Sequence, residues 1–323
     1  MNKHGLSIAA AVAFTLGLAP SAHAAWPEDG PVKIIVPQAA GGTNDTVARI
    51  ISVALGKVLK QTVIIDNRPG AAGAIGMQAV AQAKPDGYTL GIASDSAALL
   101  DAVRPAQTWK FKRDIAGVAM IGDQPISISV SGKSAYRSLA EVVSDAKARP
   151  GQVAFGTSGI GTSQHVVGEW FAQLAAISLT HIPYKGGGQA SGDLVGGQVP
   201  MAVLGLAPML QQHKRGAVRI VAVTTAKRSA ALPDVPTLTE LGYAQIALSQ
   251  WVGLVAPAGT PPAVVARLSD EMLKLIALPE VRKSLSDAGI DPRPMASAPF
   301  ARFLDDEVSH WLKLIPTLKL KLE

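Results

Sequence analysis

Apolar and polar positions switch between two periods along the first part of the chain. Residues 32–36 form a short apolar run closed by Pro37, which is typical of a buried strand. From Val47 to Leu59 the apolar side chains recur at three- and four-residue spacing, which predicts an amphipathic helix. The same reading predicts a strand at 62–66, a glycine-rich turn at 70–76, a helix to about 83 and a strand at 88–93.

A second series of strands and helices begins near residues 126–130. Ser138, with Glu141 three residues later, is a capping box that predicts a helix ending before Pro150. From Pro261 onward the pattern predicts three helices, separated near residue 279 and around 292–299. Between these segments the chain predicts strands at 153–156, 178–182, 199–204 and 218–224, with a helix after the first of them and short helices between the others. Strands that alternate with helices predict an α/β fold with largely parallel sheets.

The two series share one plan, which predicts two domains. A length of 323 residues also exceeds what one ordinary core accommodates. We expect the helical tail to return and pack on the first domain. Domain I would then comprise residues 25–123 and 252–323, and domain II residues 124–251. The chain would cross twice between them, near residues 123 and 251, and two crossings would make a hinge.

The first 24 residues have the pattern of a secretory signal peptide. Lys3 supplies a positive start, residues 6–18 are an apolar run, and Ala22-His23-Ala24 matches a small-x-small cleavage site. The run is shorter than the ~20 apolar residues of a membrane span, although an uncleaved anchor is the alternative. We therefore expect a periplasmic protein, cleaved near Ala24.

Composition narrows the classes of function. The 48% hydrophobic content excludes disorder, and the absence of cysteine excludes disulfides, thiolate nucleophiles and lipid attachment at cysteine. The 30 Lys and Arg residues are scattered among 24 Asp and Glu, which gives a net charge of +6 without a basic stripe. A nucleic-acid partner is not expected, whereas small anionic ligands suit this charge.

Two loops, one in each series, have the composition of anion-binding loops. Pro37–Asp45 and Gly156–His165 each lie between a predicted strand and a helix start and are rich in glycine and in polar side chains. Glycine lets the backbone approach a ligand, and free amides at a helix start favour an anion. Such loops lie at the carboxyl ends of strands, so both could face one cleft. Alternatively, their polar residues only cap the helices.

Catalytic patterns are missing from the sequence. No GxSxG elbow or HExxH motif occurs, and no carboxylate pair can be assigned as acid and base. Gly70–Gly76 is spaced GxxGxxG, which favours a structural turn or a cleft lining over a dinucleotide site. His165 is interpreted as a polar contact, Tyr184 as a candidate cleft residue and Lys185 as a surface charge. We expect no enzyme activity, no cofactor and no metal.

Beyond these patterns, the chain resembles a known family along most of its length. It is similar to the Bug extracytoplasmic solute receptors, which are substrate-binding proteins related to the tripartite tricarboxylate transporters. The motifs that carry the resemblance are Pro37–Asp45, Asp66–Gly76, Pro85–Leu90, Gly156–His165, His181–Gly186, Leu194–Val199, Leu232–Thr237 and Ala256–Pro261.

The resemblance implies a two-domain periplasmic-binding-protein fold of type II-like plan, with a cleft that closes on a small carboxylate. It implies a monomeric receptor that delivers this organic acid to transporter membrane subunits. Delivery to a sensor protein, or an enzyme on a Rossmann-like fold, are the alternatives. The ligand-binding residues carried over from the family, with the plausible wall positions, are Gln38, Ala40, Gly42, Thr43, Ser94, Ser158, Thr162, Ser163, Tyr184 and Leu204.

One position departs from the family pattern. The family usually has an acid at the cleft shortly after the motif ending at Val199, whereas this chain has Leu204 and Gly205 there. Our hypothesis is that the site has lost the partner of a ligand ammonium group. This favours a dicarboxylate or an aromatic carboxylate over an amino acid.

Overall fold

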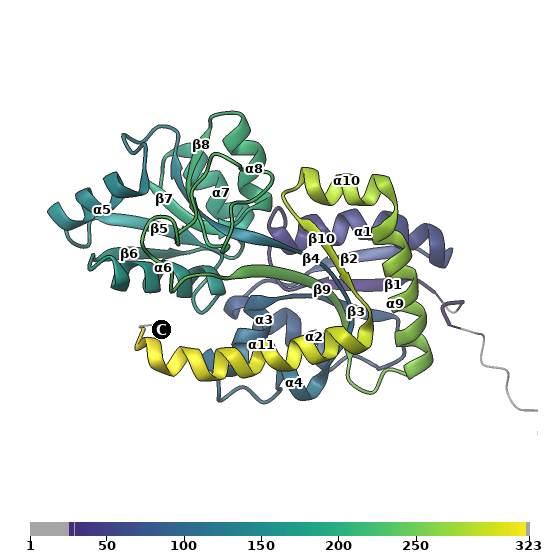
Figure 1. Cartoon of the computed structure of the whole chain (residues 1–323). Coiled ribbons are helices and arrows are strands. Elements are labelled where there is room, and N and C mark those ends of the chain that lie inside the picture. The colour runs from purple at the N-terminus through teal and green to yellow at the C-terminus, as the bar shows by residue number, and fades with distance from the viewer. Residues whose placement is uncertain (1–25, 29, 321–323) are drawn as a thin grey trace, which may run out of the picture.

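The computed structural model describes residues 26–28 and 30–320, so the predicted signal peptide lies outside the described residues. The chain folds into two α/β halves that share one long mixed sheet (Figure 1). No helix within these residues has both the length and the apolar character needed to cross a membrane.

The first half contains most of the helices. Its amphipathic helix α1 begins two residues earlier than the positions used to predict it, at Thr43, and ends at Leu59 as expected. The strands of this half are β1 (Val32–Val36), β2 (Val63–Asn67), β3 (Thr89–Ser94) and β10 (Asp291–Met295). The helices are a short turn at Ala71–Gly73, α2 (Ala74–Ala81), α3 (Asp95–Val103), α4 (Phe111–Asp114), α9 (Pro262–Ala277), α10 (Pro279–Asp287) and α11 (Ser297–Leu318).

The second half repeats the plan of strand, loop and helix. Ser138 caps its first helix, α5 (Leu139–Ala148), by accepting a hydrogen bond from the Glu141 amide at 3.3 Å. The strands are β5 (Val153–Thr157), β6 (Leu179–Pro183), β7 (Met201–Gly205) and β8 (Val218–Val223). The other helices are α6 (Ser163–Leu174), α7 (Gly187–Gly196) and α8 (Ala207–Lys214).

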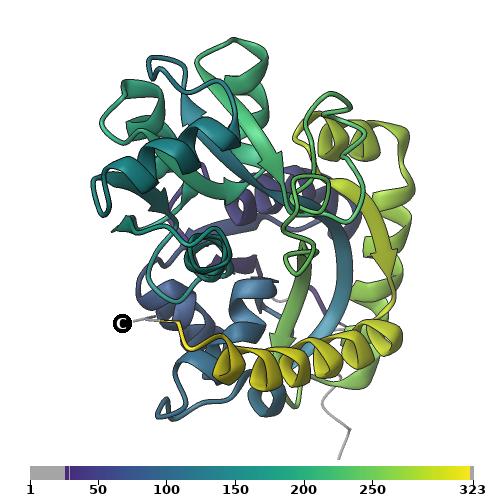
Figure 2. The same cartoon turned by 60° about the vertical axis from the view of Figure 1, so that its left-hand side comes forward.

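Two long strands, β4 (Ile115–Ser131) and β9 (Ser249–Pro257), run side by side between the halves (Figures 1 and 2). The amino-terminal part of β4 pairs with β9 and β10, and its carboxyl-terminal part pairs with β7 and β8. These pairs are antiparallel, whereas β1–β2, β1–β3, β5–β6 and β5–β7 are parallel. The prediction of largely parallel sheets is therefore wrong at the centre, because the connecting strands are not joined by β–α–β crossovers.

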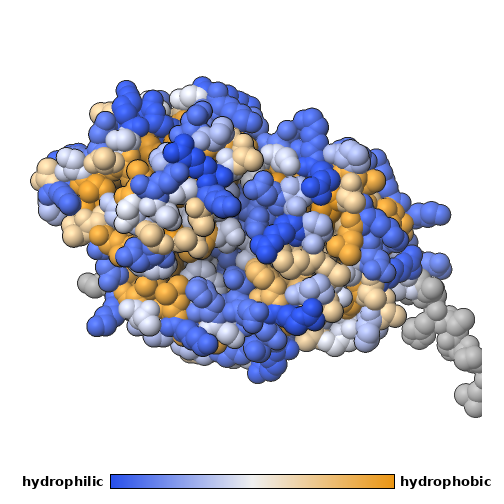
Figure 3. Space-filling model, viewed as in Figure 1, coloured by the Kyte–Doolittle hydropathy of each residue, from blue (hydrophilic) through white to orange (hydrophobic). Residues whose placement is uncertain are grey.

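Each half has apolar clusters on both sides of its sheet. In the first half, α1, α9 and α10 cover one face, and α2, α3 and α11 cover the other. In the second half, α5 and α6 cover one face and α7 and α8 the other. On the face shown in Figure 3, hydrophobic residues lie in scattered small groups among hydrophilic ones. The helical tail after residue 261 packs on the first half, as α11 does across β4 and α3.

Candidate ligand-binding site

A cavity of about 250 Å³ lies between the two halves. Larger hollows, of about 390 and 530 Å³, are lined by the first half alone. The interdomain cavity is lined from one side by the loop after β1, the turn before α2 and the end of α3, and from the other by the loops after β5 and β6. These residues are Pro37, Gln38, Gly70, Ala71, Ala72, Gly73 and Arg104 on one side, and Ser158, Gly159, Ile160, Pro183, Tyr184 and Lys185 on the other.

Asp45 fixes the loop between β1 and α1. Its carboxylate accepts hydrogen bonds from the Gly41 amide at 3.0 Å, from Arg49 at 2.9 Å and from Asn67 at 3.0 Å. Asn67 also donates to the Gln38 carbonyl at 3.0 Å. Burial acts to raise the pKa of Asp45, but these hydrogen bonds outweigh it and hold the pKa below its ordinary value. Asp45 thus remains ionised and structural, and the N-cap of α1 is Gly42, without a side-chain cap.

Thr162 fixes the loop between β5 and α6. Its hydroxyl donates to the Gly159 carbonyl at 2.8 Å and accepts from the His165 amide at 3.3 Å, so Thr162 is the N-cap of α6. The capping alternative is correct for this residue. The Ser158 hydroxyl bonds to the side chain of Gln164, which holds Ser158 at the cavity wall.

His165 stacks on His181 behind this loop, with ring centroids 3.8 Å apart. Its Nδ1 accepts a hydrogen bond from the Gly161 amide at 3.1 Å. Burial lowers the pKa of His165 to about 4, and burial with the charge of His165 lowers the pKa of His181 to about 3. Both rings are therefore neutral at pH 7, and His165 serves as a polar contact within the loop, as the sequence predicts.

The two halves touch directly beside the cavity. The Ala39 amide donates to the Lys185 carbonyl at 3.2 Å. A Cβ at Gly188 would lie 2.5 Å from the Ala40 carbonyl, and one at Gly42 would lie 3.4 Å from the Gly187 amide nitrogen. Ala40 and Gly42 thus lie at this contact, which requires glycine on the opposite side, and the molecule is in a closed arrangement.

Behind the cavity, a chain of buried polar side chains links both halves to the connecting strands. Gln124 of β4 donates to the Thr43 hydroxyl at 2.8 Å and to Gln250 of β9 at 2.6 Å. Gln250 in turn donates to Asp95 at 3.1 Å. The hydroxyls of Ser96 and Ser163, one from each half, lie 3.0 Å apart, and the Asn44 amide lies 3.5 Å from the Ser94 hydroxyl. Thr43, Ser94 and Ser163 therefore lie in this network rather than in the wall of the cavity.

The position of the missing acid is filled from within this network. A Cβ on Gly205 would lie 2.3 Å from Nε2 of Gln124 and from Oε1 of Gln250, and 2.6 Å from the Thr43 hydroxyl. Two neutral amides thus occupy the space beside Gly205. Leu204 is buried in the apolar cluster of α7 and α8.

Asp95 is a buried acid that the sequence reasoning missed. It follows β3 directly and is 1% exposed. Its Oδ1 accepts from Gln250, whereas Oδ2 has no partner among the described residues. Burial raises the pKa of Asp95 to about 7, against the lowering effect of hydrogen bonds from its neighbours. The one signal in the sequence was an acidic residue at the carboxyl end of an apolar strand.

Arg104, Gln124 and Gln250 are also absent from the sequence-based set of site residues. Arg104 lines the cavity, and the two glutamines belong to the network behind it. In residues 26–28 and 30–320 no group of three or more metal-ligating side chains was found that could hold an ion.

The fold and its interdomain cavity define a two-domain periplasmic binding protein. The profile of the tripartite tricarboxylate transporter family receptor matches residues 47–320, and the chain belongs to this family. It is 33% identical to Protein BugT of Bordetella pertussis, over 91% of this chain and 90% of that protein.

Solved structures agree with this assignment. The periplasmic binding protein BugD superposes with a TM-score of 0.87 at 28% identity, over 91% of this chain and 99% of that one. MatC from Rhodopseudomonas palustris with bound malate superposes with a TM-score of 0.84 at 29% identity, over 89% of this chain and 99% of that one. The family consists of solute-binding receptors.

Proposed function

We propose that this protein is a periplasmic receptor that binds a small carboxylate in the interdomain cavity. It delivers the ligand to the membrane subunits of a tripartite tricarboxylate-type transporter. The observation that carries this proposal is the lining of the cavity, which includes two cations, Arg104 and Lys185, and no carboxylate. The malate bound by MatC supports the same ligand class.

The domain boundaries proposed for this function are those expected from the sequence. Domain I comprises residues 25–123 and 252–323, and domain II residues 124–251. In support, Asp123 of β4 lies opposite Trp251 of β9 in the sheet, so both crossings fall at one level. Closing and opening about this level would expose and cover the cavity.

The predicted site residues take different parts in this proposal. Gln38, Ser158 and Tyr184 contact the ligand, since they line the cavity. Ala40 and Gly42 form the contact that closes over it. Thr43, Ser94, Thr162 and Ser163 hold the two loops in shape, and Leu204 supports the turn before α7 from behind.

The protein is proposed to act without catalysis, as a monomer, after removal of the leader near Ala24. The neutral amides beside Gly205 offer no counter-charge to a ligand ammonium group. A carboxylate without a free amine is therefore the proposed ligand, and aspartate or glutamate would bind weakly.

Isothermal titration calorimetry of residues 25–323 with malate, succinate, adipate, benzoate, aspartate and glutamate tests the proposal. We expect saturable binding of one or more amine-free carboxylates, with the ligand recovered unchanged. Ser158→Ala should weaken that binding about tenfold or more, because a hydrogen bond to a charged group is lost. Ser286→Ala, on the exposed face of α10, is the matched control and should bind normally. Absence of binding across the panel would contradict the proposal, as would chemical conversion of the ligand.

A further inference from the structure

Arg104 is a cationic side chain at the wall of the interdomain cavity, and it lacks an acceptor. It directly follows α3 and borders both the cavity and an outer hollow lined by residues 71–78 and 103–109. Its Nε is buried and has no hydrogen-bond partner among the described residues. A buried guanidinium donor without an acceptor is destabilising, so an anion supplied from outside the chain would relieve the deficit.

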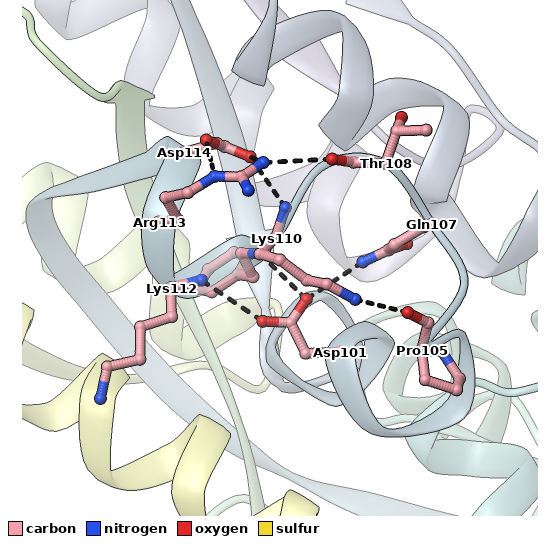
Figure 4. A network of polar contacts seen from close by, with 9 residues as sticks. Asp101, Pro105, Gln107, Thr108, Lys110, Lys112, Arg113 and Asp114 are labelled. Carbon is pink, nitrogen blue, oxygen red and sulfur yellow. Dashed lines mark hydrogen bonds and ion pairs between the residues drawn. The ribbon is translucent and has the colours of Figure 1, made fainter.

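The segment that carries Arg104 is firmly held. Asp101 accepts hydrogen bonds from the Gln107 side chain and from the Phe111 amide, each at 3.0 Å (Figure 4). Lys110 donates through Nζ to the Pro105 carbonyl at 2.7 Å, and the Gln107 amide donates to the Arg104 carbonyl at 3.1 Å. These bonds fix the backbone on both sides of Arg104. Its side chain therefore projects from a preorganised position, which lowers the entropic cost of capturing an anion.

The rest of the cavity wall offers different donors. Across from Arg104 lie the Ser158 hydroxyl and the backbone of Gly159 and Ile160, and Gln38 lies on its own side. These groups suit one carboxylate, held by neutral donors. The volume of about 250 Å³ lies below the ~300–1,000 Å³ typical of pockets for drug-sized molecules, so a compact ligand fits.

We propose that Arg104 pairs with a second carboxylate of the ligand and so makes the receptor selective for dicarboxylates over monocarboxylates of equal chain length. This inference rests on the proposed function, because the first carboxylate occupies the neutral part of the same cavity. A guanidinium binds a carboxylate through two parallel hydrogen bonds, which gives directional selectivity that a lysine lacks.

The test compares chain-length pairs by titration calorimetry: succinate with butyrate, glutarate with pentanoate, and adipate with hexanoate. The wild-type protein should bind the best dicarboxylate at least tenfold more tightly than its partner. Arg104→Gln should weaken dicarboxylate binding by about ten- to a hundredfold and change monocarboxylate binding by less than twofold. Arg104→Lys should retain part of the preference, because the charge remains. Lys147→Gln, an exposed charge on α5, is the control for loss of one positive charge.

The outcomes separate this inference from the proposed function. Tight dicarboxylate binding that Arg104→Gln leaves unchanged would overturn the role of Arg104 and leave the receptor function standing. The same holds if the wild type prefers monocarboxylates, or if Arg104→Gln weakens both classes equally. Absence of any carboxylate binding by the wild type would overturn both. Thermal unfolding without ligand shows that each variant is folded, and Arg104→Lys carries the test if Arg104→Gln is not.

Discussion

Asp95 shows how a single buried group can tune this molecule. Gln250 from β9, and Ser96 and Ser163 from the two halves, lie around its carboxyl group, and Glu307 of α11 adds negative charge nearby. An ionised carboxylate is costly in such surroundings, so burial raises the pKa of Asp95 to about 7. The folded protein therefore retains a proton that the unfolded chain releases above its ordinary pKa of 3.8.

This pKa difference predicts a pH dependence of stability. The contribution of Asp95 is fully present below about pH 4 and is lost as the pH rises towards and through about 7. Asp95→Asn keeps the shape of the neutral acid but does not titrate. Urea unfolding at pH 5 and pH 8 should show that the wild type loses more stability over this range than Asp95→Asn does. Asp270→Asn, at an exposed site on α9, should behave like the wild type. Equal losses in Asp95→Asn and the wild type would show that Asp95 is ionised in the fold.

At the scale of elements, the amphipathic helices were the most predictable part. α1 and the three carboxyl-terminal helices were anticipated because their apolar positions face one cluster each. The cap at Ser138 was visible because a capping box is a local pattern.

The connecting strands were only partly predictable. β4 was recognised from residue 126 onward, and β9 was missed. Both are buried on two sides, so their sequences do not alternate, and glycines and Pro125 interrupt the apolar run. The network of Thr43, Gln124, Gln250 and Asp95 could not be predicted, because its members lie up to 155 residues apart and meet only in the fold.

The glycine-rich loops were placed correctly between strand and helix, and the cap of α6 allows a test of what its loop does. Thr162→Ala and Ser138→Ala each remove an N-cap, and each should cost about 1 kcal/mol in the free energy of unfolding. Only Thr162→Ala loosens the cavity wall at Gly159, so only this variant should also weaken carboxylate binding, by several-fold in calorimetry. Equal binding by the two variants would show that the shape of this loop does not matter for the ligand.

At the scale of the molecule, the closed arrangement should have to open for a ligand to enter. Ala72 lies in the first half and Gly161 in the second, and a Cβ at Gly161 would lie 4.0 Å from that of Ala72. This spacing suits a disulfide, and the chain has no other cysteine to compete.

The double variant Ala72→Cys with Gly161→Cys should therefore lock the cavity shut. We expect the oxidised protein, prepared without ligand, to take up carboxylate far more slowly than the wild type, with dithiothreitol restoring uptake. The two single variants control for strain at Gly161, whose φ is +79°. Rapid uptake by the oxidised double variant would mean that the ligand enters without opening of the halves.

The central claim, that a carboxylate is held between the two halves, is tested most directly by a crystal structure of residues 25–323 grown with the tightest-binding acid from the calorimetric panel. The account predicts electron density for that acid in the cavity, in contact with Gln38 and Ser158, with the halves closed as they are here. Density for the acid elsewhere, with this cavity unoccupied at saturating ligand, would contradict it.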